Sequence, residues 1–463
     1  MGPVGIICEY NPFHNGHAAQ LRRIREDFGS ETEIVCLMSG NYVQRGEPAI
    51  FPKALRAQAA VLLGADLVLE LPLTAALSSA EGFAARGVEI LTALGCEGLS
   101  FGSECGDRNI LMSTAEANLD LRFDNLVRER LSNGCSYPKA RQLALEELGA
   151  GRGVSAPNDI LAVEYCKAIL RQGSPMEPLP ICRPGDYHAE ELDLSAPSAT
   201  ALRAALVGSV RRDGHQPPAV SAPAAAHGLS RDSAPTHLRR DEPCSSGIRY
   251  ECNLPESNPN AEVLQADKHG LSLQTHSELL RWQDAVPSCL HHLYASAPIH
   301  TMAAGERAVL AILRTLPEDA YRDLPFGAEG LWSKLLKNVR TGSSVEEILF
   351  ATKSKRYTLS RLRRMLLCAV LGLTEADLKR KPPYVRILAF NDRGRALLRR
   401  SREGLQLCNA GQTPQDPGYY ALETRAGDLY SLFCTEAARP GGEEARQRVS
   451  YLPRPCTGTE KEE

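Results

Sequence analysis

The sequence lacks three features that would assign it at once to a class of protein. Its fourteen cysteines include no Cys-x-x-Cys pair, and its first 20 residues carry a polar motif rather than a leader, so we expect a reduced, cytoplasmic location. It has no run of about 18 apolar residues, so no transmembrane helix and no membrane partner are expected. The net charge of −3 gives no general attraction for nucleic acid. Any such partner must therefore be recognised by a local cluster.

The most informative stretch that is present is residues 5–21, GIICEYNPFHNGHAAQL. Residues 4–8 are apolar and too few for a helix, so they predict a buried strand, followed by a polar turn and a helix that begins near His17. Backbone N–H groups at a helix N-terminus bind anions, Gly16 permits close approach, and His14 and His17 add donors. Taken alone, the His-x-x-His spacing is also typical of zinc ligands and of structural histidines.

Strands and helices alternate through the first half of the chain. This alternation predicts right-handed crossovers and a Rossmann-like parallel sheet, with ligands at the carboxyl ends of the strands. Gly102 lies at one such end, Asn158 is a candidate N-cap of a helix over 160–170, and Arg183 begins a loop after another strand. The expected strands are 4–8, 33–38, 65–71, 98–101 and 178–182; the expected helices are 18–28, 53–63, 80–94, 111–132, 138–148 and 160–170.

A second anion site is predicted near residue 200, where the sequence reads SAPSATALR. Ser198 and Thr200 stand at a helix start, and Arg203 follows one turn later. Hydroxyls, backbone amides and a guanidinium can together hold a phosphate. By itself, this pattern is equally that of a capped amphipathic helix.

The remaining sequence predicts three further regions. Residues 206–275 are rich in Pro, Ala, Ser and Arg without apolar periodicity and predict a disordered insertion. Residues 276–400 predict a mostly helical domain, and residues 401–463 predict a weakly structured tail. Within the helical domain we expect helices over 277–294, 305–315, 329–338, 344–351 and 359–371, and one strand over 383–390, followed by further cations over 391–400.

A basic segment within this helical domain reads KSKRYTLSRLRR over residues 353–364. It contains six cations and one aromatic ring without an acidic residue, which favours an RNA contact. Most basic helix faces are only solvated surface. The candidate RNA-binding residues are Lys353, Lys355, Arg356, Tyr357, Arg361, Arg363 and Arg364.

Several phrases occur together in a defined order: EYNPFHNGH, MSGNYVQRGEPAI, FGSE, PNDIL, SATALR and TKSKRYTLSRLRR. The first resembles the His-x-Gly-His signature of the nucleotidyltransferase superfamily. Together they resemble the tRNA(Met) cytidine acetate ligase family, over residues 2–205 and 277–400. The resemblance implies that residues 1–205 form a nucleotidyltransferase-like adenylation domain, followed by a helical tRNA-binding domain.

The same resemblance implies an activity and a set of site residues. ATP, expected with Mg²⁺, and acetate would form acetyl-adenylate, and the acetyl group would pass to N4 of the wobble cytidine of elongator tRNA(Met). His14, His17 and Arg203 would be catalytic, and no protein-held metal is expected. The nucleotide-binding set would comprise Ile7, Cys8, Glu9, Tyr10, Asn11, Pro12, Phe13, His14, Asn15, Gly16, His17, Ala18, Ala19, Gln20, Gly102, Asn158, Arg183, Ser198 and Thr200.

Two departures and two alternatives accompany this resemblance. The insertion after residue 205 is longer than expected for the family, and no Lys-Met-Ser-Lys-Ser loop is present, which disfavours an amino-acid synthetase. One alternative is a small-molecule adenylyltransferase that acts on a nicotinamide or pantetheine precursor. The other is a tRNA-binding protein whose adenylation domain is inactive.

Overall fold

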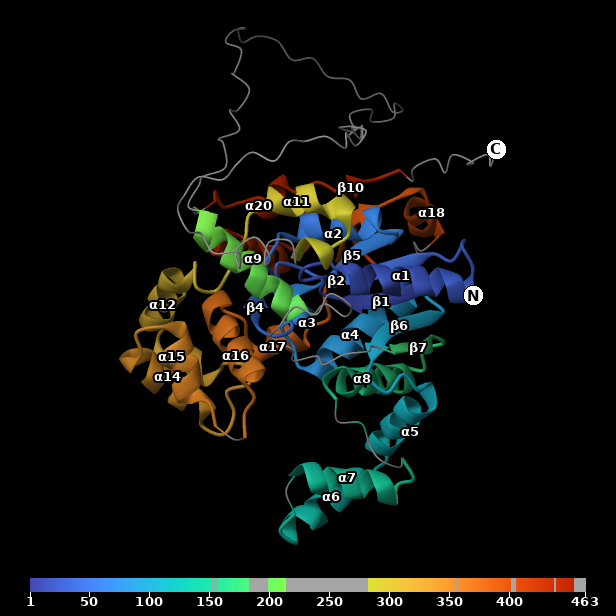
Figure 1. The fold of residues 1–463 in the computed structure, drawn as a ribbon. Helices are drawn as coiled ribbons and strands as arrows, with labels where there is room; N and C mark the ends of the chain where they lie inside the picture. The colour runs from blue at the N-terminus through green and yellow to red at the C-terminus, as the bar shows by residue number, and fades with distance from the viewer. Residues whose placement is uncertain are drawn as a thin grey trace, which may run out of the picture.

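The structure is a computed structural model (Figure 1). It describes residues 1–135, 137–150, 154, 156–182, 199–213, 282–354, 356–400, 405–436 and 439–453. The predicted insertion therefore lies outside the described residues from 214 onward, and residues 206–213 belong to a helix, α9 (Ala199–Asp213). Three predicted site residues, Arg183, Ser198 and Lys355, also lie outside the described part.

The first half of the chain builds a parallel sheet, as the alternation of strands and helices predicts. Within the described residues, one eight-stranded sheet has the order β10-β8-β5-β2-β1-β6-β7, with β9 added beside β8. All neighbouring strands are parallel except β5 and β8. The strands are β1 (Val4–Cys8), β2 (Ile34–Ser39), β5 (Leu67–Leu71), β6 (Gly98–Ser103), β7 (Glu177–Cys182), β8 (Val385–Phe390), β9 (Leu407–Asn409) and β10 (Ser450–Tyr451). The strands β3 (Tyr42–Val43) and β4 (Glu47–Pro48) form a separate antiparallel hairpin.

Helices lie on both faces of this sheet (Figure 1). Alternate residues of β2 belong to two different apolar cores: Ile34, Cys36 and Met38 to one, and Val35 and Leu37 to the other. This two-sided burial is why the strands read as continuous apolar runs rather than as alternating ones. The helices of this half are α1 (Asn15–Phe28), α2 (Lys53–Leu62), α3 (Leu73–Ala76), α4 (Ala80–Ala93), α5 (Arg108–Leu119), α6 (Phe123–Ser132), α7 (Tyr137–Glu147) and α8 (Pro157–Gln172).

The second half forms a helical domain with a core of its own. The domain packs against the first half at the buried side chains of Tyr42, Leu73 and Leu77, which belong to the same apolar cluster. The predicted α/β fold followed by a mostly helical region is therefore confirmed. The helices of the second half are η1 (Ser288–Leu290), α11 (His291–Ala295), α12 (Glu306–Thr315), α13 (Glu318–Arg322), α14 (Leu331–Thr341), α15 (Val345–Thr352), α16 (Leu359–Leu371), α17 (Glu375–Lys379), α18 (Asp392–Arg400), α19 (Pro417–Ser431) and α20 (Glu443–Arg446). Of these, η1, α11 and α18 pack into the cores on the two faces of the sheet.

The prediction of a weakly structured tail over 401–463 is wrong for much of that range. Residues 417–431 form α19, whose apolar face belongs to the core of the helical domain. The strands β9 and β10 pair with β8, which itself extends the main sheet next to β5. Both strands are only two or three residues long, so they depend on distant partners and carry little local signal. The predicted strand over 383–390 consequently belongs with the sheet, and the residues that follow it form a helix, which was not predicted.

Two predicted helices are broken in the structure. The expected helix over 111–132 ends at Leu119 and restarts at Phe123, because Asp120 is extended and its carboxylate accepts the Arg122 N–H at 2.8 Å. Such local side-chain bonds compete with helix continuation. The expected helix over 277–294 is interrupted at Pro287, after which η1 begins. Proline lacks the N–H that an uninterrupted helix needs at this position.

Within the described ranges, no helix is long and apolar enough to cross a membrane.

Candidate active site

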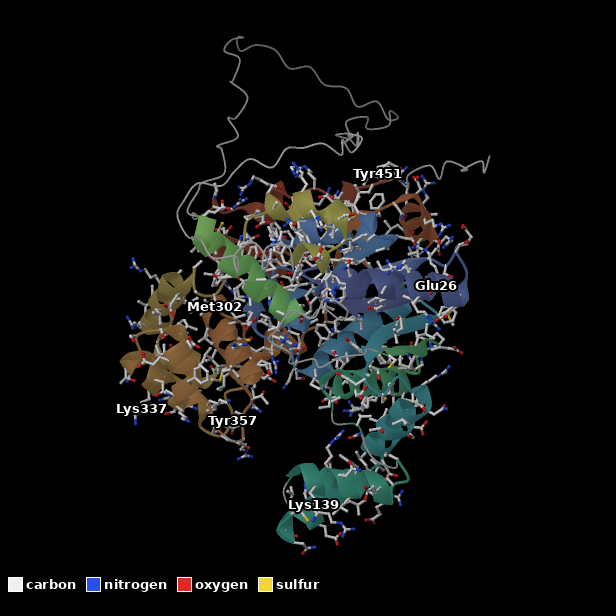
Figure 2. All side chains as sticks on the ribbon, in the orientation of Figure 1. Glu26, Lys139, Met302, Lys337, Tyr357 and Tyr451 are labelled. Atoms are coloured by element: carbon white, nitrogen blue, oxygen red, sulfur yellow. The ribbon has the colours of Figure 1, made fainter. Side chains whose placement is uncertain are left out.

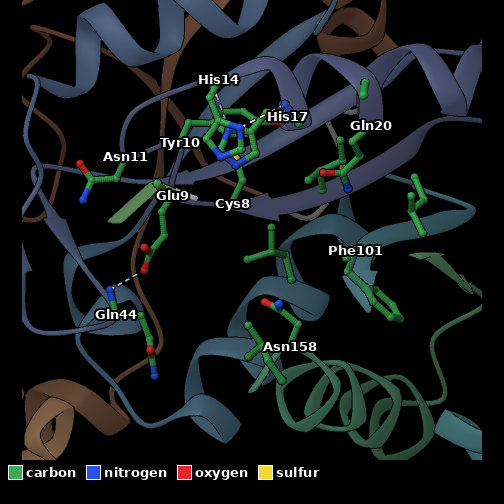
Figure 3. Close-up of a pocket in the computed structure, with 18 of the residues that line it drawn as sticks. Cys8, Glu9, Tyr10, Asn11, His14, His17, Gln20, Gln44, Phe101 and Asn158 are labelled. Carbon is green, nitrogen blue, oxygen red and sulfur yellow. Dashed lines mark hydrogen bonds between the residues drawn. The ribbon is translucent and has the colours of Figure 1, made fainter. Parts of the chain in front are cut away.

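A cleft of about 630 Å³ opens at the carboxyl ends of β1, β6 and β7 (Figure 3). The strand order changes direction between β1 and β6, since β2 and β5 lie on one side of β1 and β6 and β7 on the other. In open α/β sheets, this switch point is where the strand ends leave a crevice for a ligand. The sequence-predicted turn after the first strand is therefore placed at the mouth of the crevice.

The two histidines form one wall of the cleft and also cap helix α1. The His14 Nδ1 accepts the Gly16 N–H at 3.1 Å, and the His14 N–H donates to His17 Nδ1 at 3.3 Å. This reciprocal capping box starts the helix at Asn15, two residues before the predicted start near His17. Because both Nδ1 atoms accept hydrogen bonds, the proton of each neutral ring lies on Nε2. The Nε2–H groups are therefore the donors that this pair can direct to an anion.

The backbone that leads into the histidine turn is held from behind by Arg56 of α2. This guanidinium is fully buried and donates to the carbonyl oxygens of Glu9, Gly40 and Phe51. Burial lowers the pKa of Arg56 from its ordinary value, although nearby acidic groups oppose the change. The three carbonyls come from separate loops, so Arg56 fixes their mutual position.

The start of α9 also lines the cleft, where it contacts the histidine turn. Arg203 donates to the Asn11 carbonyl oxygen at 2.7 Å through Nη1 and to Thr200 Oγ1 at 3.1 Å through Nη2. Burial lowers the pKa of Arg203, and the positive charge of Arg45 acts in the same direction. The two predicted anion sites, about 190 residues apart in the sequence, thus meet across one cleft.

The third side of the cleft is the end of β6 with the first turn of α8. Gly102 and Asn158 both line the cleft. Asn158 is not the N-cap that the sequence predicts: Ala156 occupies that position, Pro157 begins the helix, and the Asn158 amide donates to Glu104 Oε1 at 2.7 Å. The amide of Asn158 is therefore oriented by a carboxylate that follows the neighbouring strand end.

Most of the described residues in the predicted nucleotide-binding set line this cleft. They are Ile7, Cys8, Glu9, Tyr10, Asn11, His14, Gly16, His17, Ala19, Gln20, Gly102, Asn158 and Thr200, and the predicted catalytic residue Arg203 lines it as well. Four others do not line it. Phe13 and Ala18 are buried in the core, Asn15 donates from its amide to the Asp284 carbonyl oxygen at 2.7 Å, and Pro12 lies in the turn. Their part in the motif is to shape the turn.

Sequence reasoning missed several cleft residues. Arg22 and Arg23 of α1 line the cleft, and so do Gln44 and Arg45 from the tip of the β3–β4 hairpin. The hairpin residues belong to the phrase MSGNYVQRGEPAI, which lies at the carboxyl end of a strand. Because ligands bind at such ends in open α/β sheets, the sequence already indicated that this loop could line the site. Only the fold brings them opposite Thr200.

The basic segment is less exposed than its composition suggests. Lys353 and Arg356 are exposed, and Arg356 pairs with Glu329 at 2.8 Å. Arg361 lies over the Tyr357 ring, 4.9 Å from its centroid, and donates to the Phe326 carbonyl oxygen at 3.0 Å. Tyr357 of this segment lies at the lower edge of the helical domain in the view of Figure 2.

The two arginines at the end of the segment face the protein. Arg364 is 8% exposed and lies over the Phe326 ring, and burial lowers its pKa to about 10. Arg363 pairs with Glu47 of the hairpin. For Arg364, this environment disfavours the predicted RNA-backbone contact, because the buried guanidinium donates to the Gln44 carbonyl oxygen.

In the part of the chain that the structure describes, no group of three or more His, Cys, Asp or Glu side chains could hold a metal ion.

The fold and the cleft define an α/β protein of the nucleotidyltransferase class. In agreement, the model of the HIGH Nucleotidyl Transferase family matches residues 1–242 and 265–444. The tRNA(Met) cytidine acetate ligase of Caldicellulosiruptor saccharolyticus is 32% identical over 98% of this chain and 99% of its own length. The protein of the same name from Acetivibrio thermocellus is 30% identical over 98% of this chain and 100% of its own length. The chain therefore belongs to the HIGH nucleotidyltransferases and, among them, to the tRNA(Met) cytidine acetate ligase family.

Solved structures agree on the fold. The crystal structure of Thermotoga maritima TmcAL without ligand has a TM-score of 0.72 at 24% identity, covering 98% of this chain and 100% of that protein. A second crystal structure of the same protein, bound with alpha-thio ATP, has a TM-score of 0.71.

Proposed function

We propose that this protein activates acetate with ATP and transfers the acetyl group to N4 of the wobble cytidine of elongator tRNA(Met). The observation that carries the proposal is the shared cleft, in which the histidine turn and the start of α9 meet through the Arg203 bond to Asn11. Family membership supplies the substrates, since the relatives are named for tRNA(Met), cytidine and acetate. A tRNA substrate also favours the predicted cytoplasmic location.

In the first step, a carboxylate oxygen of acetate attacks the α-phosphorus of ATP. A new O–P bond forms, the bond to the bridging oxygen of the β-phosphate breaks, and pyrophosphate leaves with that electron pair. Acetate is already an anion at neutral pH, so the step requires alignment and charge stabilisation rather than a general base. The Nε2–H groups of His14 and His17 and the guanidinium of Arg203 can supply donors to the phosphate oxygens. Magnesium carried on the ATP phosphates would add to this charge stabilisation.

In the second step, N4 of cytidine attacks the acyl carbon of acetyl-adenylate. The C–N bond forms, the C–O bond to AMP breaks, and the amine proton passes to solvent. The exocyclic amine is a weak nucleophile because its lone pair is delocalised, so a mixed anhydride is a suitable donor. A base that enters the cleft must first be unstacked, which suits the single-stranded anticodon loop. We propose that Lys353, Lys355, Arg356, Tyr357 and Arg361 contact the RNA.

The direct test is mass analysis of nucleosides from elongator tRNA(Met) treated with the protein, ATP and acetate. We expect N4-acetylcytidine that depends on both ATP and acetate and disappears when the wobble cytidine is replaced by uridine. Turnover of ATP only with a nucleotide precursor would favour a small-molecule adenylyltransferase instead. RNA binding without any turnover would favour an inactive adenylation domain.

A further inference from the structure

The β3–β4 hairpin lies between the cleft and the helical domain. On the cleft side, Gln44 and Arg45 at its tip are among the lining residues, and the Gln44 N–H donates to Glu9 Oε1 at 2.9 Å (Figure 3). On the other side, the same tip packs on the first turns of α16. A single short turn therefore touches both halves of the molecule.

The contact with α16 is made backbone to backbone. Gly46 has a φ of +79°, and a Cβ built there would lie 2.5 Å from the Arg364 nitrogen and 2.7 Å from the Arg363 carbonyl carbon. Arg364 Nη1 donates to the Gln44 carbonyl oxygen at 3.0 Å, and Arg363 pairs with Glu47. Any other residue at position 46 would have to push the hairpin off the helix.

The base of the hairpin is fixed independently of its tip. The Ala49 N–H donates to the Asn41 carbonyl oxygen at 2.9 Å, and the buried Tyr42 hydroxyl donates to the Ala426 carbonyl oxygen at 2.9 Å. The Ile50 N–H donates to Asn11 Oδ1 at 2.7 Å, which joins the hairpin to the histidine turn. With its base fixed, the tip is held by the Gln44 N–H bond to Glu9 on the cleft side and by the contact with α16 on the other.

The tip delivers a guanidinium to the predicted phosphate site. Arg45 Nη1 donates to Thr200 Oγ1 at 3.5 Å, and Arg203 donates to the same hydroxyl at 3.1 Å. Arg45 and Arg203 converge beside the Thr200 hydroxyl in a cleft that the two histidines also line, which suits an anionic ligand, although the nearby Glu47 and Glu9 offset part of the positive charge at Arg203. The triphosphate of ATP has the charge that this arrangement requires.

We infer that Arg45 is a substrate-contacting residue for the ATP phosphates and that Arg364 is a positioning residue, which holds the hairpin so that Arg45 reaches the cleft. The inference rests on the proposed function, because it requires ATP in the cleft. It adds that the helical domain completes the adenylation site as well as contacting RNA.

The first test replaces the cation itself. Acetate-dependent ATP–pyrophosphate exchange should show the KM for ATP raised roughly ten- to hundredfold in Arg45→Ala, the range for removal of one charged hydrogen bond. Arg45→Lys, which keeps the charge, should recover part of the affinity. An unchanged KM in Arg45→Ala would overturn the assignment. Absence of exchange and of ATP binding in the unmodified protein would instead defeat the proposed function.

The second test moves the hairpin without changing any charge. Gly46→Ala should raise the KM for ATP severalfold or more. The matched control is Gly95→Ala, because Gly95 has a nearly equal φ of +77° and an added Cβ there meets nothing within 4 Å. Equal effects of the two substitutions on the KM would contradict the coupling, since backbone strain alone would then explain them.

The third test concerns Arg364. Arg364→Lys removes the planar fork that donates to Gln44, so it should raise the KM for ATP with little change in kcat. Arg314→Lys is its control, because the Arg314 guanidinium donates to the Gly342 carbonyl oxygen within the helical domain instead of to the hairpin. A weaker tRNA affinity in Arg364→Lys with an unchanged KM for ATP would show that the residue serves RNA alone, and would overturn the inference.

Discussion

The two cationic regions of the molecule, the cleft around His14, His17 and Arg203 and the basic segment over 353–364, differ in what their charges face. In the cleft, the cations and the neutral N–H donors line a cavity, and backbone groups hold them from behind. In the basic segment, part of the charge is used within the protein, where Arg364 bonds to a carbonyl and Arg356 to a carboxylate. A run of cations in sequence therefore overstates the surface that is available to RNA.

The largest expected effect is on the cleft side of this comparison. His17→Ala removes a donor to the reacting phosphate, so acetate-dependent ATP–pyrophosphate exchange should fall by about 10²- to 10³-fold. The affinity for tRNA, measured by gel shift, should change little, since His17 lies outside the basic segment. His292→Ala, on helix α11, is the control and should leave the exchange unchanged. Unchanged exchange in His17→Ala would show that His17 takes no part in the adenylation step.

The next effect is on the RNA side. Reversing the two exposed cations, as Lys353→Glu with Arg356→Glu, should weaken tRNA binding and lower the slope of log K against log salt by roughly one for each phosphate that is no longer neutralised. Exchange of ATP and pyrophosphate should be unaffected. If the slope does not change, these residues do not touch the RNA backbone, and the basic segment can no longer be called an RNA-binding region.

The smallest effect is expected at the far side of the cleft. Asn158→Ala removes an amide that Glu104 orients, so the ATP Kd measured by calorimetry should rise roughly three- to tenfold, the range for one neutral hydrogen bond. Asn158→Asp places a second carboxylate beside Glu104 and should weaken binding further. If the unmodified protein and both variants bind ATP with equal affinity, Asn158 does not contact ATP and serves only the structure of α8.

The features that sequence predicted well are local. The strand Val4–Cys8, the histidine turn and the helix after it are adjacent in the chain, so their order could be predicted without the fold, although the His14 cap and the helix start at Asn15 were not. The parallel sheet followed from the alternation of elements. The meeting of the turn with Arg203 was inferred only through the family resemblance.

The features that sequence missed depend on distant partners. Arg56 reads as a surface residue of an amphipathic helix, yet it is buried and binds three carbonyls from separate loops. The strand β10 has two residues, and it pairs with β8, which lies far back in the chain, so no local pattern marks it. The start of α19 is an exception, because Asp416 as N-cap and Pro417 at the first helical position are residues that indicate a helix start in the sequence.

The most direct test of the central claim is hydrogen exchange of the full chain with and without ATP, in the absence of acetate. If one triphosphate is held between the histidine turn and the start of α9, amides in residues 9–20 and in residues 199–208 should both exchange more slowly with ATP, and those of α14 should not change. Protection of only one of the two segments, or of neither, would contradict the account.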